Sequence, residues 1–361
     1  MPTELTVQKL QAALAMDAEN LGICREFKRI HPQFDLHLYK SLPSTSTRLW
    51  KMIQAGAGAG TVVIAQRQSA GRGQRDRIWQ SEPGGLYLSL ALEPNWPVSH
   101  SAQLTCLGAW GIATALNNLG LPIKIKWPND LFFEGKKLGG ILTETKLSPA
   151  EGALSVKRLT EGDRPNPSAC IKQAVIGVGI NWHNRVPDTG ITLAQILERR
   201  PDSAANNKIN CLEVLAALVL KGILQGAYFR QQVGSQVFMK VYSDLLTQVG
   251  KVVSLDDNQL SLAIRPSLLP WQERSVLSPP SKLCDRRLSN RSGEVVGVSE
   301  EGYLQVAIGK AIKSRARLLD SCELDSQVPD GQVPDGQTPD GQTPDEARPI
   351  LLFRPSEIHI S

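Results

Sequence analysis

The residues of this chain best suited to chemistry lie close together, between positions 126 and 140. The stretch reads Lys126-Trp127-Pro128-Asn129-Asp130 and then Lys137-Leu138-Gly139-Gly140. The residue before a proline is held extended, so an amide, a carboxylate and an ammonium group project from one defined turn. Asn129 can read a nucleobase edge, Asp130 can hold Mg²⁺ on a nucleotide phosphate, and Lys137 can neutralise an anion. The stretch is typical of a site that holds a nucleotide, a metal ion and an anion together.

A second candidate site is the glycine- and arginine-rich segment from Gln68 to Trp79. Glycines allow backbone N–H groups to turn inward and form a concavity that binds anions. Arg72, Arg75 and Arg77 add donors for a phosphate or carboxylate, and Trp79 could close the loop over an apolar ligand. Taken alone, the segment could equally be an exposed loop that binds nothing.

A third candidate is Gly177-Val178-Gly179-Ile180-Asn181, at the end of an apolar run. Glycines inside a strand permit a close approach of backbone or ligand. Asn181 could read a base or could cap a turn, and the motif alone does not decide between them.

These sites must be positioned by short strands and helices. Alternation and helical spacing predict strands at 61–65, 86–92, 123–126, 138–145 and 174–180. Helices are expected at 45–54, at 102–119 with Ser101 as N-cap, and from an Asn210 cap through residue 230, with another running to about 248. Gly108 and Gly111 share the buried face of the second helix, which indicates a close approach to a sheet. The mixture lacks regular βαβ alternation and therefore favours an α+β fold.

From residue 249 the pattern changes to short strands at 251–255, 293–298, 303–308 and 313–318, typical of a small antiparallel barrel. A Pro-Asp-Gly-Gln repeat within 325–346 has turn chemistry but no apolar residues to bury, so we expect a disordered insertion. Apolar residues return at 349–353 and 357–360. We predict an N-terminal extension (1–40), a catalytic domain (41–248) and a C-terminal barrel domain (249–361).

The bulk composition excludes several classes of protein. The 361 residues are 41% hydrophobic and 21% charged, which is typical of a globular protein. No apolar run approaches a membrane span, and six scattered cysteines without a Cys-x-x-Cys pair argue against disulfides or structural zinc. The net charge of +5, with six acids and no basic residue in 325–346, suits an anionic ligand or an acidic protein partner. We expect a cytoplasmic protein that binds neither membrane nor DNA.

In combination and order, these motifs carry a resemblance. Ser44-Thr45, the Gly71-to-Trp79 loop, the 126–140 stretch and Gly177-x-Gly-x-Asn181 together resemble the biotin–protein ligase family, over roughly residues 41–320. The resemblance implies a class II synthetase-like mixed sheet with flanking helices and an SH3-like C-terminal barrel. It also implies that biotin is adenylated by ATP with Mg²⁺ and then transferred to a lysine of the biotin carboxyl carrier protein of acetyl-CoA carboxylase.

The resemblance assigns roles residue by residue. It implies that Lys137, Arg72 and Asp130 are catalytic, with Asp130 holding Mg²⁺. The implied biotin-binding residues are Ser44, Thr45, Gln68, Gly71, Arg72, Lys137 and Gly140. The implied ATP-binding residues are Arg72, Arg75, Arg77, Trp79, Asn129 and Asn181. The loop from Gly71 to Trp79 is expected to be mobile when empty and ordered by ligand, which would shield the adenylate from water.

The chain departs from the family pattern at four places. Ser46 stands where asparagine is usual, and Asp76 brings a carboxylate beside an anion site where glycine is usual. Near the C-terminus, Pro355-Ser356-Glu357 replaces a glycine-containing turn, and Ser361 stands where arginine is frequent. Many relatives carry an N-terminal DNA-binding domain, but residues 1–40 are too short for one, so we predict a monofunctional ligase.

Two alternatives remain at this point. A lipoate or octanoate ligase could use the same scaffold, although neutral hydrogen-bonding residues suit the ureido ring of biotin better than a dithiolane. A non-catalytic biotin-binding protein, inactivated by Asp76, would bind biotin without turnover. The sequence is compatible with a monomer or a homodimer.

Overall fold

The computed structural model describes residues 5–27, 33–75, 77–148, 169–255, 291–308 and 350–353. The chain divides into two compact units. The first comprises residues 1–249 and 297–304, and the second comprises 250–296 and 305–361.

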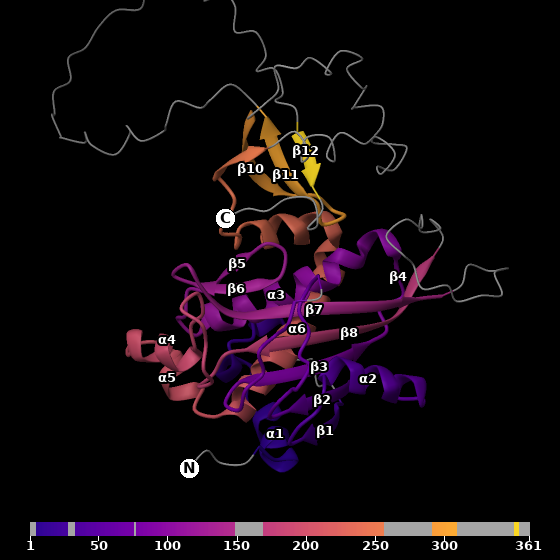
Figure 1. The fold of residues 1–361 in the computed structure, drawn as a ribbon, viewed down its shortest axis with the longest axis vertical. Coiled ribbons are helices and arrows are strands. Elements are labelled where there is room, and N and C mark those ends of the chain that lie inside the picture. Colours follow the sequence, from indigo (N-terminus) through magenta and orange to yellow (C-terminus); the bar gives the residue numbers. More distant parts are fainter. Residues whose placement is uncertain are drawn as a thin grey trace, which may run out of the picture. The chain divides into compact units, whose positions relative to one another are not determined.

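An eight-stranded mixed sheet forms the centre of the first unit (Figure 1). Its strands are β1 (Asp35–Tyr39), β2 (Thr61–Ala65), β3 (Leu86–Leu92), β4 (Trp96–Pro97), β5 (Lys124–Lys126), β6 (Asp130–Phe133), β7 (Lys136–Leu147) and β8 (Cys170–Ile180). The order is β1-β2-β3-β8-β7-β6-β5, and β4 pairs with β8. Only β1 and β2 pair in parallel along this path; the other neighbours are antiparallel. The α+β prediction is confirmed.

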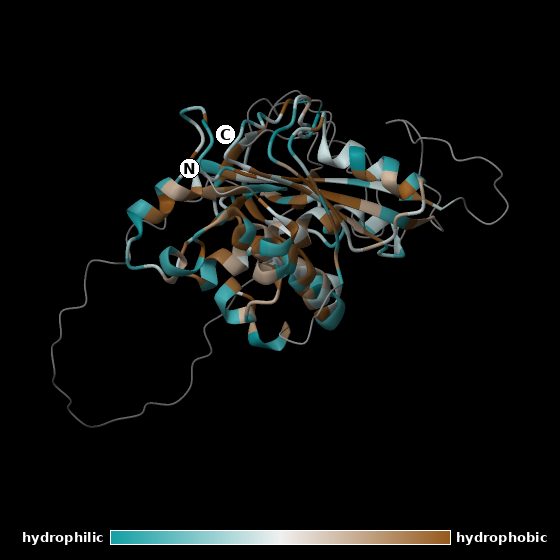
Figure 2. Cartoon of the chain, turned by 90° about the horizontal axis from the view of Figure 1, so that it is seen from below, coloured by the Kyte–Doolittle hydropathy of each residue, from teal (hydrophilic) through white to brown (hydrophobic). Residues whose placement is uncertain are grey.

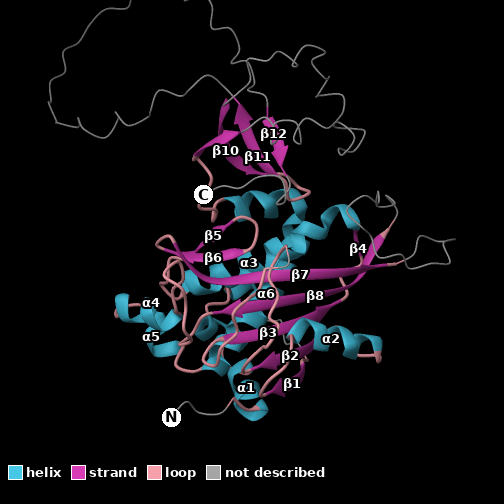
Figure 3. Cartoon of the chain, in the orientation of Figure 1, coloured by secondary structure: helices cyan, strands magenta, loops and turns pink. Residues whose placement is uncertain are grey.

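Helices cover both faces of this sheet (Figure 3). They are α1 (Val7–Leu14), α2 (Thr45–Gln54), α3 (Ser101–Asn118), α4 (Leu193–Arg199), α5 (Ala204–Lys208) and α6 (Leu212–Ser243). Gly108 of α3 faces Ile176 of β8, whereas the adjacent Gly177 faces Ser46 of α2. Because successive strand residues point to opposite faces, α2 and α3 lie on opposite sides of β8. Figure 2 shows apolar residues concentrated along the strands, with hydrophilic residues on the outer helices.

The core of this unit depends on close contact between α3 and α6. A Cβ added at Gly111 would lie 1.9 Å from the Gly222 carbonyl oxygen, and one at Gly226 would lie 2.2 Å from that of Leu107. The predicted approach to the sheet is therefore correct for Gly108, which faces Ile141 and Ile176, but wrong for Gly111, which faces a helix. Helical spacing identifies the buried face but not the element that covers it.

Helix α6 is long and apolar enough to pass a composition test for a membrane span. However, 67% of its most apolar 18-residue stretch is buried inside the protein. The buried share and the glycine contacts with α3 identify α6 as a core helix of this unit.

The predicted strands 61–65 and 86–92 and the helix 45–54 are confirmed, whereas two predicted helix caps are wrong. Ser101 lies inside α3, and His100 occupies the N-cap position without a capping hydrogen bond. Cys211, not Asn210, precedes α6. Gly234 (φ +80°) separates α6 into two helical parts, as the prediction of two successive helices requires. Side-chain capping is local chemistry, and here burial of the apolar face sets the ends instead.

Part of the predicted N-terminal extension belongs to the sheet of the first unit. β1 pairs in parallel with β2, from Asp35 opposite Thr61 to Tyr39 opposite Ala65. In α1, Leu10 and Ala13 are buried. The sheet of the first unit thus includes residues 35–39.

The second unit contains a four-stranded sheet in the order β12-β11-β10-β9. Its strands are β9 (Val252–Leu255), β10 (Arg291–Val298), β11 (Leu304–Ile308) and β12 (Ile350–Phe353). Four of the predicted C-terminal strands are present. The predictions for 313–318, the repeat within 325–346 and 357–360 fall outside the described residues, as do Asp76, residues 355–357 and Ser361.

Candidate active site

One cavity of about 390 Å³ lies over the sheet of the first unit, and it brings the three candidate motifs together. The predicted site residues that line it are Ser44, Thr45, Gln68, Arg72, Arg77, Trp79, Asn129, Asp130, Lys137, Gly140 and Asn181. The predicted Gly71 and Arg75 are not among the lining residues. A cavity of this size is in the range of small-molecule sites.

The floor of the cavity consists of glycines on two paired strands. Gly140 of β7 lies opposite Gly179 of β8, and Gly177 lies two residues further along β8 on the same face. All three line the cavity. A Cβ at Gly179 would lie 2.4 Å from Trp79 Nε1, and one at Gly140 would lie 3.1 Å from Asp130 Oδ1. The missing side chains therefore create the space in which Trp79 and the charged groups lie.

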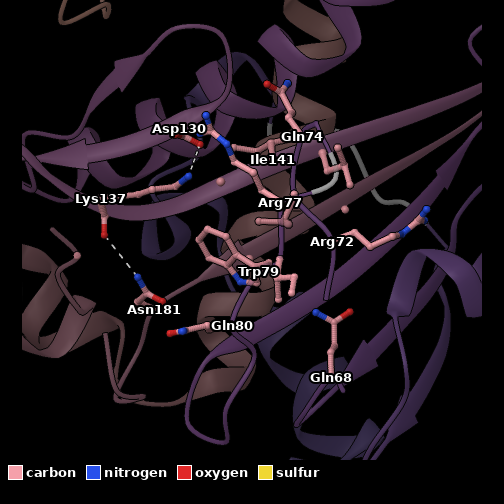
Figure 4. A pocket seen from close by; sticks show the side chains of 18 of the residues that line it. Gln68, Arg72, Gln74, Arg77, Trp79, Gln80, Asp130, Lys137, Ile141 and Asn181 are labelled. Atoms are coloured by element: carbon pink, nitrogen blue, oxygen red, sulfur yellow. Dashed lines mark hydrogen bonds and ion pairs between the residues drawn. The ribbon is translucent and has the colours of Figure 1, made fainter. Parts of the chain in front are cut away.

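An ion pair marks one end of the cavity (Figure 4). Lys137 Nζ lies 2.7 Å from Asp130 Oδ1, and the two side chains are 33% and 24% exposed. They project from β7 and β6, which are joined by a tight turn whose Glu134 and Gly135 have positive φ. The Lys137 backbone is fixed as well, because its N–H donates to Thr189 and its carbonyl accepts from Ile191.

Helix α6 and the residues after it hold the Trp-Pro-Asn-Asp turn in place. The Tyr242 hydroxyl donates to the Pro128 carbonyl at 2.7 Å, and the Trp127 N–H donates to Gln248 Oε1 at 3.2 Å. Burial raises the pKa of Tyr242 well above its ordinary value, so the hydroxyl stays protonated and remains a donor. The Trp127–Pro128 peptide bond is cis.

The loop from Gly71 to Trp79 closes on itself as a short hairpin. The Trp79 N–H donates to Gly71 O at 3.0 Å, and the Gly73 N–H donates to Arg77 O at 2.7 Å. The Trp79 ring lies over Gly179, between the ion pair and Gln68 in Figure 4, with Lys137 Nζ 5.1 Å from its centroid. Trp79 Nε1 is buried and has no hydrogen-bond partner among the described residues. The indole is thus placed to form one wall of the site.

Arg72 does not point toward the ion pair. Its Nη2 lies 2.7 Å from Oε2 of Glu144 on β7, which also accepts from Trp50 Nε1 at 3.2 Å. Figure 4 shows the guanidinium directed away from Asp130 and Lys137. For Arg72 to contact an anion near Lys137, it would have to leave Glu144.

Away from the ion pair, Gln68 and the start of α2 supply uncharged hydrogen-bonding groups. The backbone N–H and the hydroxyl of Thr45 both donate to Gln68 Oε1, at 2.8 and 3.1 Å. Ser44 caps α2 and accepts from the Thr47 N–H. Thr45 and Ser46 follow in the first turn, so the start of this helix presents hydroxyl groups to the cavity.

Three asparagines surround the charged end. Asn129 Nδ2 donates to Ile141 O at 2.7 Å, and Asn181 Nδ2 donates to Lys137 O at 3.4 Å. The Asn181 amide oxygen accepts from Asn184 Nδ2 at 3.0 Å. Asn129 and Asn181 line the cavity as predicted, and Asn184 is an additional lining residue.

The residues present fit Mg²⁺ only as a partner of a bound nucleotide. Within the described ranges, no group of three His, Cys, Asp or Glu side chains could enclose a metal ion. Mg²⁺ is commonly held by one or two carboxylates together with substrate phosphates and water. Among the lining residues that the structure describes, Asp130 is the one carboxylate.

Sequence reasoning missed the residues behind the cavity wall. They include Ser81, Ser89, Glu144 and Asn184, which contact lining residues or line the cavity. For Ser89 a signal was present, because it is the one polar residue in β3, Leu86–Leu92, apart from the Tyr87 hydroxyl. A serine in a strand whose residues 86–91 are all buried requires a hydrogen-bond partner.

Part of the chain is similar to a known protein family. Residues 38–155 match the Biotin/lipoate A/B protein ligase family. This segment of the chain is similar to that family. The matched segment contains α2, the Gly71-to-Trp79 loop and the 126–140 stretch.

Individual relatives extend the similarity beyond that segment. The Bifunctional ligase/repressor BirA of Bacillus subtilis is 29% identical over 278 residues, which are 75% of this chain and 69% of that protein. The Biotin–[acetyl-CoA-carboxylase] ligase of Paracoccus denitrificans is 30% identical over 150 residues, which are 41% and 54% of the two chains. The solved biotin protein ligase of Aquifex aeolicus in complex with biotin and ATP is 22% identical, covers 76% of this chain and 91% of its own, and has a TM-score of 0.49.

Proposed function

We propose that this protein adenylates biotin with ATP and transfers the biotinyl group to a lysine of the biotin carboxyl carrier protein of acetyl-CoA carboxylase, in the cytoplasm. The observation that carries the proposal is the polarity of this cavity. Neutral hydrogen-bonding groups of α2 and Gln68 lie at one end, and Lys137 and Asp130 lie at the other. Biotin has the same polarity, with an uncharged urea at one end and a carboxylate at the other.

The first step joins two anions. A carboxylate oxygen of biotin attacks the α-phosphorus of ATP, the P–O bond to the β-phosphate breaks, and pyrophosphate leaves. Positive charge must offset the repulsion between carboxylate and phosphate and hold them in line. Lys137 would supply that charge, and Arg72 would add to it after it separates from Glu144.

A magnesium ion bound with ATP would neutralise the leaving pyrophosphate. Asp130 would be its protein ligand, and the ion would then replace Lys137 as the partner of that carboxylate. Asn129 and Asn181 would bind the adenine, and Trp79 would exclude water from the adenylate.

In the second step the neutral amine of the carrier lysine attacks the acyl carbon of biotinyl-adenylate. The acyl–oxygen bond breaks, AMP leaves with the electron pair, and the amine loses its proton to solvent. The product is an amide, biotinyl-lysine. Among the relatives are proteins named as bifunctional ligase/repressors and one named as a biotin–[acetyl-CoA-carboxylase] ligase. We propose ligase activity alone for this chain, as a monomer or homodimer without DNA binding.

The test is transfer of labelled biotin to a biotin carboxyl carrier domain, with Mg-ATP, without ATP, and with Mg-ATP plus excess EDTA. We expect label on one carrier lysine in the first reaction only. Biotin binding without transfer would replace the proposal with a non-catalytic biotin-binding protein. Transfer of lipoate to its carrier protein, with no binding of biotin, would replace it with lipoate ligation.

A further inference from the structure

A chain of hydrogen bonds runs behind the neutral end of the cavity. Ser46 Oγ lies 3.0 Å from Ser89 Oγ, and the Ser89 hydroxyl lies 2.8 Å from Thr45 Oγ1. Thr45 continues the chain to Gln68 Oε1 at 3.1 Å. Ser89 is fully buried, at 0% exposed, and Ser46 and Thr45 are 6% and 4% exposed. Water therefore has little access to this chain of hydrogen bonds. Each hydroxyl hydrogen in it must bond to a neighbouring residue.

The direction of every bond follows from counting hydrogens. The backbone N–H of Thr45 can only donate, so the Gln68 atom that faces it at 2.8 Å is the carbonyl oxygen. That oxygen cannot donate, so the Thr45 hydroxyl must donate to it. A hydroxyl has a single hydrogen, so Thr45 accepts from Ser89. Ser89 has then used its own hydrogen, and Ser46 must donate to Ser89.

The amide group of Gln68 is also held on its nitrogen side. It donates to Ser81 Oγ at 2.8 Å, and the Ser81 hydroxyl donates to the Trp79 carbonyl at 3.1 Å. One N–H of Gln68 remains for a ligand. On the helix side, the hydroxyl hydrogens of Ser46 and Thr45 are committed, and only their lone pairs remain.

We propose that Ser89 is a positioning residue for substrate recognition: it makes Ser46 and Thr45 hydrogen-bond acceptors while Gln68 stays a donor. This pattern is complementary to a cyclic urea, which offers two N–H donors and one carbonyl acceptor. The inference rests on the proposed function, since biotin is the urea that the ligase would bind. It gives the departure at Ser46 a role, because a serine oxygen whose hydrogen is committed to Ser89 can only accept.

Gly177 provides the space for this arrangement. A Cβ there would lie 2.8 Å from Ser46 Oγ and 3.6 Å from Ser89 Oγ. Gly177 lies directly opposite Ser89 in the β3–β8 pairing, so the glycine and the serine are fixed beside each other by the sheet. The position of Ser89 is thus set by strand register rather than by a loop.

The test is a comparison of wild type with Ser89→Ala. In the variant the Ser46 hydroxyl hydrogen can turn toward the cavity. It would then face a ligand N–H, and two donors cannot form a hydrogen bond with each other. We expect the Kd and the KM for biotin to rise about tenfold or more, as for a lost buried hydrogen bond. Desthiobiotin, which keeps the urea but lacks the thioether ring, should show the same loss. The KM for ATP should be unchanged, which a general loss of structure would not permit.

A matched control and a second variant complete the experiment. Thr143→Val removes a buried hydroxyl on β7 that has no hydrogen-bond partner among the described residues, and it should leave all constants unchanged. Ser46→Ala should weaken biotin binding to a similar extent. The double variant should bind biotin no more weakly than either single variant, because Ser89 acts through Ser46.

The outcomes are distinguishable. If wild type binds biotin and Ser89→Ala binds it equally well, or if the two losses are additive, the positioning role is overturned and the proposed function stands. If Ser89→Ala does not fold, unchanged biotin binding by Ser46→Ala overturns the inference instead. If wild type does not bind biotin, both the function and the inference are overturned.

Discussion

Lys137 combines two roles that compete for one ammonium group. In the structure it pairs with Asp130 at 2.7 Å, whereas in the proposed reaction it faces a carboxylate and a phosphate. A partly exposed ion pair contributes little to stability, about 0–1 kcal/mol. The side chain can therefore be removed with a small structural cost and a large catalytic one.

We predict that Lys137→Ala slows biotin-dependent ATP–pyrophosphate exchange by about 10²–10³-fold, as for the loss of one electrostatic donor in an active site. Its melting temperature should stay close to that of wild type, because the Lys137 backbone bonds to Thr189 and Ile191 remain. Lys136→Ala, an exposed neighbour in the same strand, is the control and should retain activity. Equal rates for the two variants would remove Lys137 from the catalytic assignment.

The Arg72–Glu144 pair leads to the opposite expectation. Glu144→Gln removes the carboxylate that holds Arg72 away from the site but can still accept from Trp50 Nε1 through its amide oxygen. Since the pair is worth up to about 1 kcal/mol, ATP and biotin should bind up to about fivefold more tightly in the variant. Isothermal titration at low salt measures this. Weaker binding would show that Glu144 orients Arg72 productively instead.

Most site residues could be predicted from the sequence because their types and order are unusual together. Ser44, Thr45, Asn129, Lys137 and Asn181 all line the cavity. The direction of Arg72 was not predictable, since it depends on Glu144, which lies 72 residues away. The relay through Ser89 was also not predictable, because it depends on strand register, which sequence patterns fix only weakly.

Among the elements, α3 and α6 pack with their backbones in close contact. Gly111 and Gly108 lie one turn apart in α3, but only a Cβ at Gly111 would meet a backbone oxygen, at 1.9 Å; at Gly108 the nearest atoms are side-chain carbons at 3.6 Å. A carbonyl oxygen within a helix cannot move aside as a flexible side chain can.

We therefore predict that Gly111→Ala lowers the free energy of unfolding by about 1–3 kcal/mol, the usual cost of overpacking. Gly108→Ala should be neutral, or stabilising by up to about 1 kcal/mol, because alanine favours the helix. Urea denaturation of both variants measures the difference. Equal stability of the two would contradict the close approach of α3 and α6.

Periodicity predicted elements well where burial alternates along the chain, as in β2, β3 and the helix α2. It failed at helix ends. The break at Gly234 agrees with the prediction of two helices, one through residue 230 and another after it. Ends set by tertiary burial leave no local signal of the kind that a capping serine gives.

At the scale of the whole molecule, a buried arginine connects distant parts of the first unit. Arg230 of α6 donates to Gln103 of α3, to His100 Nδ1 at 3.2 Å and to Ser235, and its guanidinium lies 3.6 Å from the Trp96 ring centroid. Because His100 Nδ1 accepts this bond, the imidazole is neutral. Burial, and then the Arg230 charge, lower the pKa of His100 below its ordinary value.

The sign of the pH dependence follows from that shift. A base whose pKa is lowered by folding binds a proton more readily when unfolded. Its stabilising contribution is therefore complete above the ordinary histidine pKa of about 6.5 and is lost as the pH falls toward the lower folded value. Wild type should lose stability over this interval, whereas His100→Gln should lose less. Melting temperatures from pH 8 to pH 5 test this, and parallel curves for the two proteins would contradict it.

The parallel pairing of β1 with β2 has a consequence for any shortened form of the chain. Val62, Val63 and Ile64 of β2 are at most 1% exposed, and β1 covers their backbone on one side. A fragment that begins at residue 41 would turn β2 into a hydrophobic edge strand with unpaired N–H and C=O groups, which is a template for intermolecular pairing. Such a fragment would retain every proposed catalytic residue but would be prone to aggregate. A loss of its activity would therefore reflect aggregation and not the absence of a catalytic group.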